Sequence, residues 1–184
     1  DSILDRTEVQ RRLKALLSNF PDRKCKIYMI HGHLTDEQMQ ALYQHPKIKA
    51  VVSTAHGESW GFPLFEAAYN ELPVIAPDWS GHLDFLTMKD EDGVEKKMFA
   101  KIQCDIKQVL DQHVWKGVLE KESNWAYPVA ASYKERLREV YKDYPRFKSW
   151  SKKLNVWIRK EFTEEKVYGK FLESVGYSKK EVDW

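Results

Sequence analysis

Residues 48–77, with the sequence IKAVVSTAHGESWGFPLFEAAYNELPVIAP, decide the fold. The apolar runs 48–54 and 73–77 are short, as are strands that lie buried in a parallel sheet. Between them, Pro63 suits the first turn of a helix that extends to about Asn70. A strand, a helix and a second strand in this order predict a parallel βαβ unit.

The sequence before this unit also alternates between helix and strand. Residues 7–19 have apolar residues at helical spacing, and residues 25–30 (CKIYMI) are a short apolar run that we expect to form a strand. Thr35 and Gln38 have the spacing of a capping box. They predict a helix that begins at this point and ends before Pro46.

The sequence after the unit ends in a long helical region. The first expected elements are a charged turn, a strand and a helix, at residues 89–97, 97–104 and 108–117. A helical pattern follows at 128–175, with breaks at Pro145 and at 162–163. We therefore expect an α/β fold with a Rossmann-like, mainly parallel sheet and flanking helices over residues 1–126. Residues 127–184 form a helical C-terminal third that packs on the same domain.

The composition excludes several classes of protein. The chain has 184 residues, of which 42% are hydrophobic, and 30 Lys and Arg against 28 Asp and Glu leave a net charge of +2. Cys25 and Cys104 are too few cysteines for a disulfide scaffold or a four-cysteine metal site. No apolar run reaches the roughly 18 residues of a membrane-spanning helix, and the N-terminus lacks a signal-peptide layout. We expect a cytoplasmic protein, with the membrane face as a second location.

The stretch HGESWGFPLFE, residues 56–66, holds the most chemical information. Glu58 follows a predicted strand, where ligands of parallel sheets bind, and Glu66 lies near the start of the next helix. Gly57 and Gly61 allow backbone N–H groups to come close to a ligand, and the helix N-terminus favours an anion such as phosphate. Two carboxylates beside an anion site suit a polyhydroxylated ligand, because each accepts hydrogen bonds from hydroxyl groups.

The run ESWGFPLFE resembles the donor-binding core of retaining glycosyltransferases of family 4, which have the GT-B fold. That family has a glutamate, a Gly-Phe-Gly-Leu-Pro-like run and a second glutamate eight positions after the first, as Glu58 and Glu66 are here. The flanking segments IYMIHGHLTDEQMQALY and EAAYNELPVIAPDWSGHLDFL are similar to the family as well. The closing helix FTEEKVYGKFLE also resembles that of the family. The resemblance is close over residues 27–86 and loose over 128–175.

The resemblance implies a role for each matching residue. Glu58 matches the glutamate that contacts the donor sugar, and it is the candidate catalytic residue. Glu66 matches the glutamate that binds the ribose hydroxyls of the nucleotide. The family's loop around sugar and diphosphate, and its Gly-Gly turn, match the other donor-binding candidates, which are Ser59, Trp60, Gly61, Phe62, Ser80 and Gly81. His56 and His82 follow predicted strands and are further candidates near the donor.

The implied reaction transfers a sugar from a nucleoside diphosphate sugar to an acceptor hydroxyl, with retention at the anomeric carbon and without a metal cofactor. The family's arginine and lysine that clamp the diphosphate, and its amino-terminal acceptor domain, have no counterpart in these 184 residues. Cations matter because the leaving diphosphate is negative. We therefore expect a donor-binding part of a longer enzyme, lacking its first strands and inactive alone, with the donor and the acceptor domain as partners. A non-catalytic module that binds a nucleotide or glycan, or acts in protein interactions, is the alternative.

Residues 134–160 form a basic region, with ten Lys and Arg against three Asp and Glu and with aromatic residues between them. We favour a solvated helix face whose aromatic side chains pack into the core. Peripheral contact with an anionic membrane is the next alternative, and nucleic acid is the least favoured. The histidines lack a paired spacing such as H-E-x-x-H, so we expect no metal site.

Overall fold

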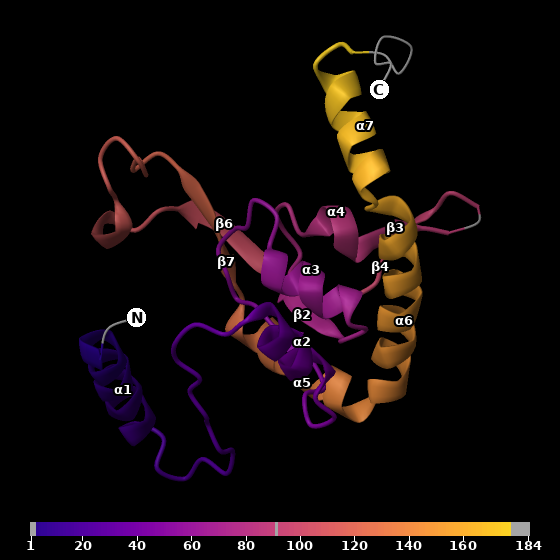
Figure 1. Cartoon of the computed structure of the whole chain (residues 1–184). Helices are drawn as coiled ribbons and strands as arrows, with labels where there is room; N and C mark the ends of the chain where they lie inside the picture. Colours follow the sequence, from indigo (N-terminus) through magenta and orange to yellow (C-terminus); the bar gives the residue numbers. More distant parts are fainter. Residues whose placement is uncertain (1–2, 91, 178–184) are drawn as a thin grey trace. The chain divides into compact units, whose positions relative to one another are not determined.

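The computed structural model describes residues 3–90 and 92–177, and Figure 1 shows their arrangement into helices and strands. The chain divides into two compact units, one up to Leu42 and one from Tyr43 onward. The two units are described separately below.

The first unit contains α1 (Ile3–Ser18) and most of α2 (Asp36–Gln44). The capping box is confirmed, since the Thr35 N–H donates to Gln38 Oε1 at 2.9 Å and the Gln38 N–H donates to Thr35 Oγ1 at 3.3 Å. The strand expected at 25–30 is wrong, because this segment has no strand conformation. A short apolar run becomes a strand only where a neighbouring strand pairs with it, and Tyr28 is 81% exposed here.

The second unit is built on a parallel three-stranded sheet in the order β1-β2-β5. Its strands are β1 (Val51–Val52), β2 (Val74–Pro77) and β5 (Ala100–Ile102). Val51 pairs with Val74, and Ile75 pairs with Ala100. The mixed α/β class and the parallel sheet are therefore confirmed, and the strand predicted at 48–54 is shortened to an edge strand in which Val52 is 40% exposed.

The core of the second unit surrounds β2, all four residues of which are buried. Ile75, Ala100 and Ile102 pack with Val140 and Phe147. The last two come from α5 (Ala130–Lys142) and α6 (Tyr144–Glu161), so two helices of the C-terminal third close one side of the sheet. The breaks predicted near Pro145 and at 162–163 are confirmed by the ends of α5, α6 and α7 (Glu164–Ser174).

The helix α3 (Phe62–Tyr69) connects β1 to β2 and packs against both β2 and α6. Figure 1 shows α3 in front of β2, with α6 beside it. Side chains of α6 satisfy the carbonyl groups at the end of α3: Asn155 Nδ2 donates to the Tyr69 carbonyl, and Ser151 Oγ donates to the Glu71 carbonyl at 2.8 Å. These contacts fix the position of α3, and with it the position of the loop that precedes it.

Two antiparallel hairpins extend the sheet region. The charged turn predicted at 89–97 is confirmed, because it joins β3 (Thr87–Lys89) to β4 (Glu95–Lys97) beside the short helix α4 (Leu83–Leu86). The helix expected at 108–117 is wrong. Its place is taken by a loop with one 3-10 turn, Asp111–His113, between β6 (Cys104–Gln108) and β7 (Asn124–Pro128). Gly117, with φ 82°, turns the chain within this loop.

Candidate functional site

The candidate site begins with the loop between β1 and α3. The loop ends at Gly61, which has φ 86° and precedes the first turn of α3. This left-handed conformation suits glycine, and Gly61 offers no side chain to cap the helix. Pro63 occupies the first turn, as predicted. The N-terminus of α3 is therefore free of a side-chain cap at the carboxyl end of the sheet.

A second loop follows β2 and locks onto the first. The Glu58 N–H donates to Ser80 Oγ at 2.7 Å, and the Ser80 hydroxyl donates to the Glu58 carbonyl. The Gly81 N–H donates to the same carbonyl at 3.0 Å. Ser80 has φ 89°, a conformation that glycine adopts readily and serine rarely does. The backbone at Ser80 therefore has a conformation typical of glycine.

Gly81 allows the two loops to touch. A Cβ atom at this position would lie 2.0 Å from the Ser59 carbonyl oxygen and 2.7 Å from the Ser59 carbonyl carbon. Both atoms belong to the backbone, so no side-chain movement would relieve the clash. Residues 58–61 and 80–81 are thus one cradle made mostly of main chain, which we call the two-loop cradle.

The two glutamates have different surroundings. Glu58 is half-buried in the cradle, whereas Glu66 is exposed on α3. Burial of Tyr43, followed by a hydrogen bond and charge interaction with the Glu66 carboxylate, raises the pKa of Tyr43 to about 12. Tyr43 thus holds Glu66 from the end of α2. The sequence offers no signal for this pairing, because Tyr43 and Glu66 lie on different helices.

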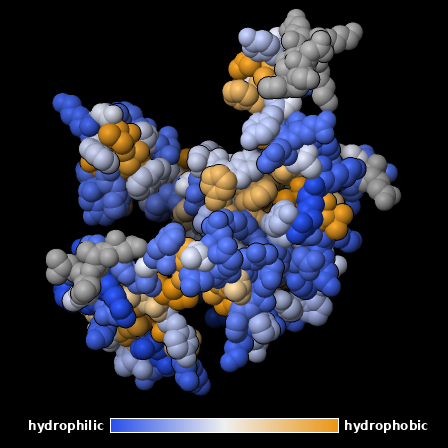
Figure 2. Space-filling model, in the orientation of Figure 1, coloured by the Kyte–Doolittle hydropathy of each residue, from blue (hydrophilic) through white to orange (hydrophobic). Residues whose placement is uncertain are grey.

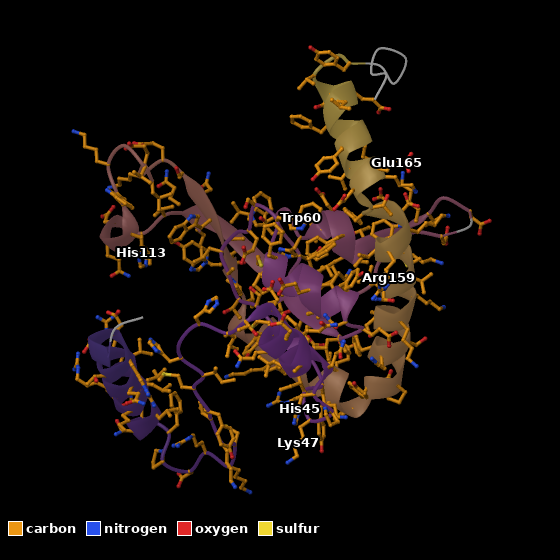
Figure 3. All side chains as sticks on the ribbon, in the orientation of Figure 1. His45, Lys47, Trp60, His113, Arg159 and Glu165 are labelled. Atoms are coloured by element: carbon orange, nitrogen blue, oxygen red, sulfur yellow. The ribbon has the colours of Figure 1, made fainter. Side chains whose placement is uncertain are left out.

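Trp60 packs in an aromatic cluster, and Phe62 is exposed beside it at the same groove. The Trp60 ring lies 5.2 Å from Phe85 and 5.5 Å from Phe162, measured between ring centroids. Figure 3 shows Trp60 in the region between α3 and α4. Trp60 and Phe62 also line an open groove of about 1250 Å³, and the described lining of this groove contains neither Glu58 nor Glu66. Their side chains thus belong to this groove, and only their backbone belongs to the cradle.

The two candidate histidines are held by backbone carbonyl groups. His56 Nδ1 donates to the Ala126 carbonyl at 2.9 Å, and its ring stacks on Trp125 with centroids 4.9 Å apart and planes at 7°. A carbonyl oxygen can only accept a hydrogen bond, so Nδ1 of His56 carries a proton. In the neutral ring, Nε2 therefore has a free lone pair that can accept a hydrogen bond. The sequence did not predict the β6–β7 hairpin that carries Trp125, so the stacking of His56 on Trp125 could not be predicted either.

His82 is almost fully buried, at 2% exposure. Its Nε2 donates to the Pro77 carbonyl at 2.7 Å, and its Nδ1 is buried without a hydrogen-bond partner in the structure. The carbon atom Cβ of His82 would be 3.5 Å from a Cβ at Gly61. The buried His82 side chain therefore packs against the backbone of the cradle at Gly61.

The described residues, 3–90 and 92–177, contain no group of three or more His, Cys, Asp or Glu side chains that could hold a metal ion. Within the same residues, no helix is both long and apolar enough to cross a membrane. Comparisons with protein-family models, curated proteins and solved structures found no match. The candidate site therefore rests on the geometry of this chain.

Proposed function

We propose that the chain is the donor-binding part of a retaining glycosyltransferase with a GT-B type of carboxyl-terminal domain. It would bind a nucleoside diphosphate sugar for transfer of the sugar to an acceptor hydroxyl. The two-loop cradle is the observation that carries this proposal. It brings Glu58, the uncapped start of α3 and the glycine-like Ser80–Gly81 turn together at the carboxyl end of a parallel sheet.

Each part of the cradle suits one part of such a donor. The start of α3 provides N–H groups and a positive dipole end for phosphate oxygens. Gly61 and Gly81 add no side chains to the cradle, and the absence of a Cβ at Gly81 lets the second loop lie against the backbone of Ser59. Glu58 and Glu66 accept hydrogen bonds from hydroxyl groups, and Glu66 keeps free lone pairs beside its contact with Tyr43.

A thermal-shift screen against UDP-, GDP- and ADP-sugars tests the proposal. A donor at a hundred times its dissociation constant should stabilise the fold by about 2.7 kcal/mol, which raises the melting temperature by roughly 5 to 11 °C. Glu66→Gln keeps the shape but removes the charge, and it should weaken binding of the same donor. Glu122→Gln, an exposed glutamate in the β6–β7 loop, is the matched control. No shift with any of the three donor classes would refute donor binding.

A second candidate is a non-catalytic module that binds the donor without transferring the sugar. Among the described residues, the hydrogen bonds between the two loops of the cradle join backbone groups and the Ser80 hydroxyl, and none of them involves a lysine or an arginine. A departing diphosphate needs cationic stabilisation, so this arrangement favours binding over chemistry. Release of labelled sugar from a donor that is bound, with or without an acceptor, would exclude this second candidate.

A further inference from the structure

The open groove beside Trp60 has an apolar floor. Trp60 and Phe65 pack with Phe162, at centroid distances of 5.5 to 5.9 Å, and Phe65 meets Phe162 at an interplanar angle of 74°. Phe62 is 69% exposed at the same groove, and Val167 of α7 lines it at 44% exposure. Figure 2 shows hydrophobic residues on α7 next to hydrophilic ones. The groove therefore presents apolar surface to whatever occupies it.

Lysines surround this floor. The lining residues include Lys89 and Lys97 from the β3–β4 hairpin, Lys160 from α6 and Lys170 from α7. A neighbouring pocket of about 650 Å³ shares Glu95 and Lys97 with the groove, and it adds three further lysines, Lys96, Lys101 and Lys153. The two pockets adjoin at Glu95 and Lys97, and together we call them the lysine-rimmed groove.

The positive charge of the lysine-rimmed groove exceeds its negative charge. Its described lining contains seven lysines and three carboxylates, the latter being Asp84, Glu95 and Glu161. Lys166 donates to Glu161 at 3.0 Å, and together with Lys160 and Lys170 it lowers the pKa of that carboxyl. One carboxylate therefore faces three ammonium groups. Lys96 forms an ion pair with Asp90, and Lys97 forms one with Asp78. Further positive charge on the lining comes from Lys89, Lys101 and Lys153.

We propose that the lysine-rimmed groove binds anionic phospholipid at a membrane surface. The lysines contact lipid phosphates, and Phe62 and Val167 contact the acyl region. This ligand class combines an anion with an apolar chain, as the groove combines a lysine rim with an aromatic floor. The proposal concerns a surface separate from Glu58 and Glu66, and it stands whether or not the chain binds a donor sugar.

Nucleic acid fits the same groove less well. None of the described lining residues of either pocket is an arginine, whose planar guanidinium suits nucleic acid better than an ammonium group does. Base stacking needs free aromatic faces. Here Trp60, Phe65 and Phe162 pack against one another, so their rings form a floor rather than a row of stacking platforms.

Co-sedimentation with vesicles tests the proposal. The chain should bind vesicles that contain phosphatidylglycerol, bind vesicles of phosphatidylcholine alone much less, and lose affinity as salt is added. Lys160→Gln and Lys170→Gln should each weaken binding about fivefold, equivalent to about 1 kcal/mol. Lys134→Gln and Lys142→Gln on α5, outside the groove, are the matched controls and should change little. Glutamine is close to lysine in helix propensity, and thermal unfolding checks that every variant folds.

The outcomes separate the alternatives. A selective loss in the two groove variants, together with weaker binding in Val167→Ser, supports the proposal. Equal losses in the groove and control variants, or no preference for anionic vesicles, overturn it. Salt-sensitive retention of a single-stranded oligonucleotide that is lost in the same groove variants, without vesicle binding, assigns the groove to nucleic acid instead. Competition by inorganic phosphate that abolishes vesicle binding at equal ionic strength would show a site for free phosphate and also overturn it.

Discussion

Replacing Gly81 with alanine should separate the two loops of the cradle. The new Cβ would lie 2.0 Å from the Ser59 carbonyl oxygen, which is 1.0 Å inside the 3.0 Å below which real Cβ contacts essentially never occur. A shift of about that size breaks the hydrogen bond from the Gly81 N–H to the Glu58 carbonyl. It also strains the bond between the Glu58 N–H and Ser80 Oγ. The substitution therefore acts on the backbone contact that defines the site.

The cost of this substitution can be worked out from its parts. The broken hydrogen bond contributes about 1 kcal/mol, and steric strain in a packed region, which includes the strained second bond, adds about 1 to 3 kcal/mol. We expect Gly81→Ala to lower the free energy of unfolding by about 3 kcal/mol. For a chain of this size that corresponds to a decrease of about 6 to 12 °C in melting temperature. Donor affinity should fall as well, because the cradle no longer holds its shape.

Urea unfolding followed by tryptophan fluorescence measures the effect, with Gly57→Ala as the control. Gly57 lies in the same cradle-forming segment, but a Cβ there would be 3.7 Å from Ser80 Oγ, an ordinary contact. The control should lose less than about 1 kcal/mol, the usual range for a tolerated change in a loop. Two results would show that the close packing of the loops is not what stabilises the cradle. One is a free energy of unfolding for Gly81→Ala within about 0.5 kcal/mol of that of the unaltered chain. The other is an equal loss of this free energy in Gly81→Ala and Gly57→Ala.

Two further predictions concern the same region. Ser80→Ala should lower the free energy of unfolding by about 1 to 2 kcal/mol, because it loses the hydrogen bonds to Glu58 and keeps a positive φ. Ser80→Gly should cost about 1 kcal/mol less, because glycine adopts a positive φ readily. Urea midpoints that rank the two variants in the opposite order would contradict this. Tyr43 has a pKa of about 12 in the fold against 10.0 ordinarily. The contribution of this raised pKa to the free energy of unfolding is complete below pH 10. It is lost as the pH rises from 10 toward 12, because the unfolded chain releases the Tyr43 proton at a lower pH than the folded chain does. Tyr43→Phe should remove the part of the stability loss that comes from Tyr43. The difference in urea midpoint between Tyr43→Phe and the unaltered chain should therefore change between pH 10 and 12. A constant difference would show that Tyr43 does not titrate as expected.

The elements around the cradle were predictable because several local signals agreed. Residues 73–77 combine a short apolar run with flanking prolines, and they form the central, fully buried strand β2. Pro63 marks the start of α3, and Thr35 with Gln38 marks the start of α2. Each signal involves residues close together in the chain, which is the range over which propensity and capping act.

The errors concern strands whose pairing partners are distant or missing. The run 25–30 is apolar enough for a strand, but hydrogen bonding to a neighbour is what would make it one. The β6–β7 hairpin was missed because a long loop separates its strands and because one of its apolar residues, Ile106, is 49% exposed. Without that hairpin, the position of His56 against Trp125 could not be derived.

The sequence indicated candidate residues for the site but not the contacts between them. The glycine-like conformation of Ser80 follows from its place in a tight turn, yet the mutual hydrogen bonds between Ser80 and Glu58 depend on tertiary structure. The link between Tyr43 and Glu66 joins two helices that are separated in sequence. Motif spacing indicated which residues to consider, and the folded backbone determined which of them touch.

The two-loop cradle has a consequence for protein engineering. Its shape is set by main-chain atoms of residues 58–59 and 80–81 and by one serine hydroxyl. The side chain of Ser59 is exposed and lies outside these contacts, which involve only its backbone. A library randomised at Ser59 should therefore retain the backbone geometry while it changes the chemical groups presented to a ligand. The cradle offers a scaffold in which ligand selectivity can be altered separately from the fold.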